Sequence, residues 1–180
     1  MLMKTLQSWL VIVLILFLIC SRSVAEEQSS YQLGPGDTIR IQVFGEQDMS
    51  LDAKLSDAGT VIYPFMGEIK VSGLTISQVA KLITDGLNDR YLVDPKVSVG
   101  VLEYRPFFIN GEVGKPGAYP YQPGLIVQKA VTIAGGFSER ASRSSVTLIR
   151  DSDPTHASAD VDLDTAVMPG DVITVEESFF

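Results

Sequence analysis

The sequence has 180 residues, one histidine, one cysteine and a formal net charge of −8. This length fits one domain or two small ones. The acidic balance argues against nucleic acid or an anionic membrane surface as a partner, because both bind through clustered Lys and Arg side chains.

Residues 1–25 have the pattern of a secretory signal peptide. Lys4 provides the positive charge, residues 9–20 form an unbroken apolar run, and small residues precede a cleavage site between Ala25 and Glu26. The apolar run is shorter than the ~20 residues that span a bilayer as a helix. We therefore expect the mature chain to be secreted.

Two other interpretations of this segment stay open. It could remain uncleaved as an N-terminal anchor, or Cys20 could carry a lipid, although Leu18 and Ile19 are bulkier than the residues that usually precede a lipidated cysteine. Cleavage after Ala25 would remove the only cysteine, so that no disulfide could form. It would also change the net charge from −8 to −10, because two cations and no acid are lost.

Two turns of the same composition bracket the rest of the chain. They are Gly34-Pro35-Gly36-Asp37 and Met168-Pro169-Gly170-Asp171, and each precedes an alternating run typical of a strand, at 38–44 and 172–175. Proline presets φ for the first central position of a turn, glycine accepts positive φ at the second, and aspartate bonds nearby backbone amides. We therefore expect Asp37 and Asp171 to hold the turns.

The first half of the chain combines short strands with one helix. The helix is predicted to begin at Thr75, which has capping-box spacing to Gln78, and to end between Leu87 and Tyr91. Its apolar residues recur at helical spacing and form one face. Alternation predicts strands at 50–55, 60–65, 66–71 and 96–101.

The second half repeats this organisation after a boundary near Arg105. A helix is predicted at 125–134, ended by Gly135-Gly136. Strands are predicted at 107–113, 118–121, 146–150 and 159–163. Since each half has one helix and short links between strands, the predicted fold class is α+β: two small modules, 31–105 and 106–177, each a mixed β-sheet with one packed helix.

Several spaced motifs together resemble the bacterial polysaccharide export proteins of the outer-membrane auxiliary type. In the first half these are Tyr31-x-Leu33-Gly34-Pro35-Gly36-Asp37, Asp57-x-Gly59-x-Val61-x-x-Pro64-x-x-Gly67, Gly73-x-Thr75 and Asp94-Pro95-x-Val97-x-Val99. The second half is similar to a soluble-ligand-binding β-grasp (SLBB) module, through Gly111-Glu112-Val113-x-x-Pro116-Gly117-x-Tyr119, Ala134-Gly135-Gly136 and Pro169-Gly170-Asp171.

The resemblance implies a ring-forming homo-oligomer in the periplasm, associated with the cell envelope or outer membrane. Its implied partners are a polysaccharide and an inner-membrane chain-length regulator. It also implies that strand 38–44 can pair with the second module. Because no helix is predicted after Val175, we expect no helical pore from this chain itself. Two alternatives stay open: a separate outer-membrane pore protein is a further partner, or the chain acts as a periplasmic ring only.

Two groups of residues are candidates for function. Turn or family-motif positions are Gly34, Pro35, Gly36, Asp37, Gly111, Pro116, Gly117, Gly135, Gly136, Pro169, Gly170 and Asp171. Candidate interface or glycan contacts are Arg40, Tyr63, Tyr119 and Tyr121. The purely structural alternatives are a helix C-cap for the Gly135-Gly136 pair, sheet-surface packing for the tyrosines and an exposed charge for Arg40.

No catalytic, metal or cofactor site is predicted. The only histidine, His156, lies in a polar stretch, so no nucleophile-base pair or metal-ligand spacing can be assembled. The sequence predicts a polysaccharide export component that is not an enzyme. Two alternatives stay open: a soluble glycan- or small-ligand-binding β-grasp protein that forms no channel, and a polysaccharide-modifying enzyme built on paired carboxylates.

Overall fold

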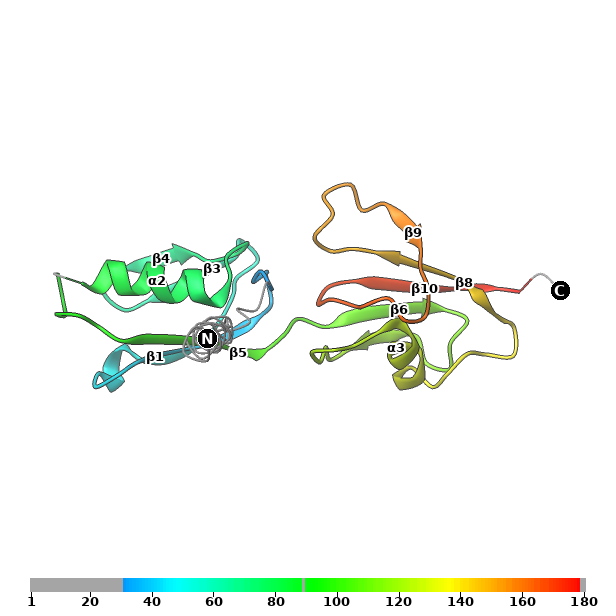
Figure 1. The fold of residues 1–180 in the computed structure, drawn as a ribbon, viewed down its shortest axis with the longest axis horizontal. Helices are drawn as coiled ribbons and strands as arrows, with labels where there is room; N and C mark the ends of the chain where they lie inside the picture. Colours follow the sequence, from blue (N-terminus) through cyan, green and yellow to red (C-terminus); the bar gives the residue numbers. More distant parts are fainter. Residues whose placement is uncertain (1–30, 89, 179–180) are drawn as a thin grey trace, which may run out of the picture. The chain divides into compact units, whose positions relative to one another are not determined.

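The computed structural model describes residues 31–88 and 90–178. The predicted signal peptide, its cleavage site at Ala25 and Glu26, and Cys20 lie outside the described residues. Within the described residues, none of the helices is long and apolar enough to cross a membrane. The chain is of the α+β class, as predicted, with two helices of α type and several sheets in this part (Figure 1).

The first module is built on a three-stranded sheet in the order β2-β1-β5. Its strands are β1 (Thr38–Val43), β2 (Leu51–Lys54) and β5 (Val97–Glu103), and the 3-10 helix η1 (Gln47–Met49) links β1 to β2. The central strand β1 pairs antiparallel with both neighbours. A separate antiparallel hairpin contains β3 (Thr60–Tyr63) and β4 (Gly67–Lys70).

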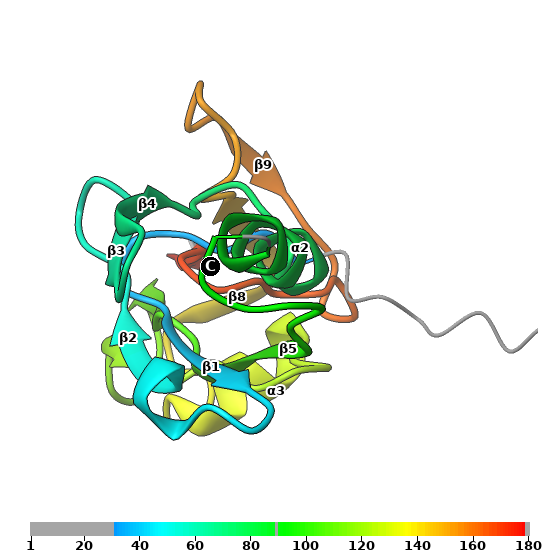
Figure 2. The same ribbon diagram turned by 90° about the vertical axis from the view of Figure 1, so that its left-hand side faces the viewer.

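Helix α2 (Ile76–Leu87) covers one side of this sheet (Figures 1 and 2). The predicted capping box is present: Gln78 N donates to Thr75 Oγ1 and Thr75 N donates to Gln78 Oε1. These bonds satisfy two of the four backbone donors that a helix N-terminus leaves open. The buried face of α2 joins the inward residues of β1 in one core, which includes Ile39, Ile41, Val43, Val79, Ile83, Leu87 and Val99.

One implication of the resemblance is not met by the structure. Strand β1 does not pair with the second module; it lies between β2 and β5 of its own module, with Ile41 opposite both Leu51 and Val99. Its alternating apolar side chains are fully buried against α2. This burial specifies the register, because a shift by one residue would turn the whole apolar set to solvent.

The second module is a five-stranded sheet in the order β7-β6-β10-β8-β9 with one helix. The strands are β6 (Phe107–Gly111), β7 (Gly117–Tyr119), β8 (Ala141–Ile149), β9 (Ser158–Asp160) and β10 (Val172–Glu177). Strand β10 runs parallel to β6 and antiparallel to β8, so the sheet is mixed. A separate core lies between this sheet and α3 (Val127–Ile133).

The second helix is shorter than predicted. It begins at Val127 rather than at residue 125, because Ile126 is extended and forms a bridge with Ala166. Leu125 is buried all the same, which is why it fits the apolar pattern of the helix. The helix ends at Ile133 and is followed by Gly135 and Gly136, both with positive φ.

Candidate functional site

The first Pro-Gly-Asp turn is built around a fully buried carboxylate. Asp37 accepts the backbone N–H of Gly34 at 2.8 Å and the Tyr31 hydroxyl at 2.5 Å. Its other oxygen accepts the backbone N–H of Arg105 at 2.8 Å, just after β5 ends. Gly36 has φ +90°, as the second central position of a type II turn requires. Asp37 therefore joins the start of β1 to the end of its neighbour β5.

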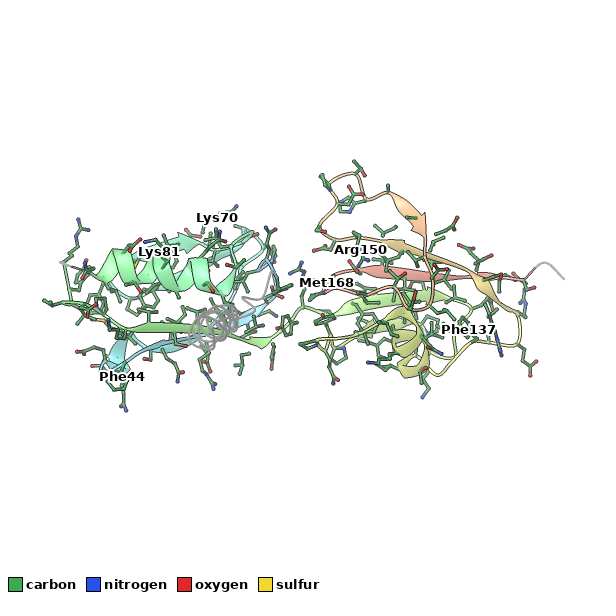
Figure 3. All side chains as sticks on the ribbon, viewed as in Figure 1. Phe44, Lys70, Lys81, Phe137, Arg150 and Met168 are labelled. Atoms are coloured by element: carbon green, nitrogen blue, oxygen red, sulfur yellow. The ribbon has the colours of Figure 1, made fainter. Side chains whose placement is uncertain are left out.

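The second turn repeats this arrangement in the other module. Asp171 is 1% exposed and accepts the backbone N–H of Met168 at 2.8 Å. Its other oxygen accepts the backbone N–H of Asp151 at 3.3 Å, just after β8. The guanidinium of Arg150 donates to Asp171 at 2.6 Å, and Arg150 and Met168 lie at the same end of the module (Figure 3). Asp171 therefore joins the start of β10 to the end of β8.

Arg105 connects the two turns. Its Nη1 lies 3.1 Å from Asp37, while its Nε and Nη2 lie 3.1 Å and 2.8 Å from Asp151 Oδ2. The Arg105 side chain is 15% exposed, against 43% for Asp151. Its planar fork suits two carboxylates at once, which a lysine ammonium does not. We name this group of five residues, Asp37, Arg105, Arg150, Asp151 and Asp171, the paired-turn network.

Aromatic rings line one side of this network. Tyr31 and Tyr104 meet edge to face with centroids 5.1 Å apart, and Tyr104 meets Tyr121 in the same way at 5.2 Å. Burial raises the pKa of the Tyr31 hydroxyl, and its hydrogen bond to the Asp37 carboxylate raises it further. Burial also raises the pKa values of Tyr104 and Tyr121. These hydroxyls therefore stay protonated at neutral pH.

Sequence reasoning found the two turn carboxylates but missed their partners. Arg105, Arg150 and Asp151 were not among the candidate residues, yet they complete the network. The sequence does contain a signal. An arginine follows the antiparallel neighbour of the strand that comes after each Pro-Gly-Asp turn: Arg105 follows β5, the neighbour of β1, and Arg150 follows β8, the neighbour of β10. Finding it requires the pairing of β1 with β5 and of β10 with β8, which lie far apart in sequence.

The glycine motifs of the second module act through backbone hydrogen bonds and backbone conformation. Gly136 N donates to Val131 O at the C-terminus of α3, while the carbonyls of Gly136 and Ala134 accept N–H groups from Gly114 and Lys115. The pair therefore joins the helix to the turn that contains Pro116 and Gly117. Gly111 has φ +78°, and a Cβ there would collide with the backbone of Val175.

Two of the candidate tyrosines donate their hydroxyl groups to backbone carbonyls within the protein. Tyr63 is 1% exposed, and its hydroxyl donates to Met49 O at 2.8 Å, so it is a core residue and not a surface contact for a glycan. The alternation of β3 places it on the inward face with Val61. Tyr119 is half-buried against Phe107, and its hydroxyl donates to Lys115 O.

Arg40 pairs with an acidic residue of its own chain. Asp52 lies opposite it in the antiparallel register of β1 and β2, and the two side chains form a bidentate pair with both bonds at 2.7 Å. The hydrogen bond from Arg40 lowers the pKa of Asp52. Both side chains are almost half exposed, so the pair contributes little to stability.

The carboxylates and the histidine of the described residues have structural or exposed surroundings. Among them, no three His, Cys, Asp or Glu residues are grouped closely enough to hold a metal ion. His156 is exposed in the loop between β8 and β9. The buried carboxylates of the paired-turn network accept several hydrogen bonds each and are oriented by them, as structural carboxylates are.

Comparison with known families divides the chain at the point where the two cores separate. Residues 25–102 match the family described as polysaccharide biosynthesis/export protein. Residues 106–156 match the SLBB domain. The first match ends within β5 and the second begins just before β6.

Curated relatives carry names from polysaccharide export. The exopolysaccharide production protein ExoF of Rhizobium meliloti is 38% identical over 122 residues, which cover 59% of this chain and 28% of ExoF. The polysialic acid transport protein KpsD of Escherichia coli is 29% identical over 91 residues, 49% of this chain and 16% of KpsD. The EPS I polysaccharide export outer membrane protein EpsA of Ralstonia nicotianae is 32% identical over 114 residues, 61% of this chain and 29% of EpsA. The matched parts thus span less than a third of each relative.

Proposed function

We propose that this chain, in which residues 25–102 match the polysaccharide biosynthesis/export family and residues 106–156 match the SLBB domain, is a non-enzymatic component of a machinery that exports a capsular or extracellular polysaccharide. The observation that carries the proposal is the order of two matched domains along one chain, export domain first and SLBB domain second. The names of ExoF, KpsD and EpsA, all from polysaccharide production or export, support it.

In this proposal the protein acts in the periplasm at the cell envelope, as a homo-oligomeric conduit or an adaptor. The transported chain would make weak, repeated contacts with polar side chains, while the energy for transport comes from other components. An inner-membrane chain-length regulator and a separate outer-membrane pore protein are the proposed protein partners. Support for a conduit or adaptor comes from the two domains, each with its own buried core, and from the absence of a group of metal-ligating residues among the described residues.

The test is the distribution of high-mass polysaccharide between medium and envelope. It is measured in a strain that lacks the gene, in the same strain with the gene restored, and in the parent. We expect secreted polymer to disappear in the deletion strain and to return with the gene. Unchanged secretion would contradict the export role and would favour a soluble glycan-binding protein that forms no channel.

A further inference from the structure

The sheet of the first module has one face that is covered and one that is open. On β1, Ile39, Ile41 and Val43 are buried against α2, while the alternating residues Arg40 and Gln42 are exposed. The neighbouring strands follow the same division, with Asp52 and Lys54 of β2 and Ser98 of β5 exposed on the side away from α2. We call this side the outer face; its polar groups are amide, hydroxyl, ammonium, guanidinium and the Asp52 carboxylate, and Leu102 of β5 adds an exposed apolar side chain.

The outer face is hollowed at the end of β1. A groove of about 680 Å³ is lined by polar side chains from three segments, Gln42, Gln47, Ser50, Lys96 and Ser98, and by the neighbouring Val43, Phe44, Gly45 and Val97. A smaller hollow of about 300 Å³ adjoins it, shares Gln42 and Ser50 with it, and reaches the Arg40–Asp52 pair. The larger groove falls within the 300–1,000 Å³ typical of ligand sites, and the two together suit an extended ligand.

Gly100 makes the middle of the outer face flat. It lies inside β5, opposite Arg40, and its φ is not in the left-handed region. A Cβ at this position would meet no atom within 4 Å. Neither backbone conformation nor packing therefore requires glycine here, although glycine weakens a strand. The Arg40 side chain is held over β2 by Asp52, on the other side of β1, so the space above Gly100 stays open.

Charge and aromatic character indicate what this face binds. Lys96 is the only charged residue that lines the larger groove, and no carboxylate does, in a chain whose net charge is −8. Lys96 pairs with Asp94, but both side chains are more than two-thirds exposed, so the pair is weak and the ammonium remains available. Phe44, 87% exposed, lies at the rim on the side opposite α2 (Figure 3). An aromatic ring presents an apolar platform, and the apolar face of a sugar ring packs onto such a platform.

We propose that the outer face of the β2-β1-β5 sheet binds a segment of an acidic or neutral glycan. Gln42, Gln47 and Ser98 would contact sugar hydroxyls, Lys96 an acidic group and Phe44 the apolar face of one sugar ring. Gly100 leaves room for the chain to lie flat on the strands. The proposal rests on the proposed export function and names the surface through which that function acts.

The test is a titration of the ¹⁵N-labelled protein with size-fractionated fragments of the polysaccharide that the producing strain secretes. We expect shifts in the backbone amides of Gln42, Ser98 and Gly100. The variant Gly100→Thr should bind about tenfold more weakly, because a branched side chain fills the open space, while the strand itself gains stability. Phe44→Ala should weaken binding about fivefold, through the loss of roughly 1 kcal/mol of ring contact.

Ala159→Thr provides the matched control, since it places the same side chain on the exposed strand β9 of the other module. It should bind as the parent protein does. Parental affinity in Gly100→Thr, or shifts confined to other surfaces, would overturn the proposal. So would a change in oligomeric mass in Gly100→Thr, because the outer face would then be an interface between copies.

The deletion experiment separates failure of this proposal from failure of the export role. Loss of secretion in the deletion strain without binding at the outer face would refute the site and leave the export role standing. Binding at the outer face with unchanged secretion would refute the export role and leave the site standing.

Discussion

Asp37 and Asp171 make matching contacts in the two modules. Each accepts the backbone N–H of the residue three positions earlier at 2.8 Å, and each accepts a second backbone N–H from the end of the antiparallel neighbour strand. Each also pairs with an arginine, Arg105 at 3.1 Å or Arg150 at 2.6 Å. The same kind of turn thus has the same structural role in both modules: it joins the start of a central strand to the end of the strand beside it.

Replacement of the first turn carboxylate should destabilise the protein strongly. In Asp37→Asn the buried side chain loses its charge and presents an NH₂ group where several donors converge. We expect the free energy of unfolding to fall by about 2–4 kcal/mol. Urea unfolding followed by circular dichroism measures this change. The control Asp52→Asn removes an exposed carboxylate that also pairs with an arginine, and it should leave stability nearly unchanged. Equal effects of the two substitutions would contradict the structural role assigned to Asp37.

Arg105 should couple the two modules. In Arg105→Lys the charge is kept, but one ammonium cannot reach Asp37 and Asp151 with the geometry of the guanidinium fork. We expect a loss of about 1–3 kcal/mol and a broader calorimetric transition, as the modules begin to unfold separately. Arg140→Lys, at an exposed arginine that pairs with Glu177, is the control and should unfold as the parent does. A single sharp transition of unchanged midpoint in Arg105→Lys would refute the coupling.

Gly111 should tolerate no side chain. It combines φ +78° with a backbone carbonyl of Val175 in the place of a Cβ, so Gly111→Ala adds a steric clash to the conformational strain. We expect a loss of at least about 2 kcal/mol, measured by thermal unfolding. Gly124→Ala is matched in φ, at +80°, but has no atom within 4 Å of the added Cβ. It should cost only the strain of about 1–2 kcal/mol, and an equally large loss there would show that the clash at Gly111 does not matter.

Stability should fall at alkaline pH. Burial raises the pKa of Tyr31, Tyr63, Tyr104 and Tyr121 in the folded protein, whereas an unfolded tyrosine titrates near pH 10. Above about pH 10 the unfolded chain therefore binds fewer protons than the folded chain, and linkage lowers stability as pH rises. Below that pH these hydroxyls are protonated in both the folded and the unfolded state, so they do not make stability depend on pH.

Urea unfolding at intervals from pH 8 to pH 11 would measure this dependence. Tyr31→Phe removes the hydroxyl that is both buried and bonded to Asp37, so its stability should decline less steeply than that of the parent above about pH 10. The comparison concerns slopes, because loss of the hydrogen bond lowers stability at every pH. Parallel curves for the two proteins would contradict the role assigned to Tyr31.

Local sequence patterns predicted much of the fold because their causes are local. The capping box at Thr75 and Gln78, the apolar face of α2 and the alternation of β1 and β10 depend on neighbours within a few residues. The start of α3 was misplaced for a tertiary reason: Ile126 is drawn into a bridge with Ala166, forty residues away. Tyr63 was placed on the surface by residue type, whereas packing in the core decided its burial.

The sequence by itself determined the resemblance to polysaccharide export proteins, the α+β class and the two turns, since each depends on the order of residues along the chain. Only the tertiary structure decided that β1 stays in its own module, that Arg105 connects Asp37 to Asp151, and that Gly100 lies on an open polar face. These outcomes depend on which strands pair and which faces are buried. Partners separated by 46 to 68 residues meet only when the sheets form, and no local pattern encodes their contact.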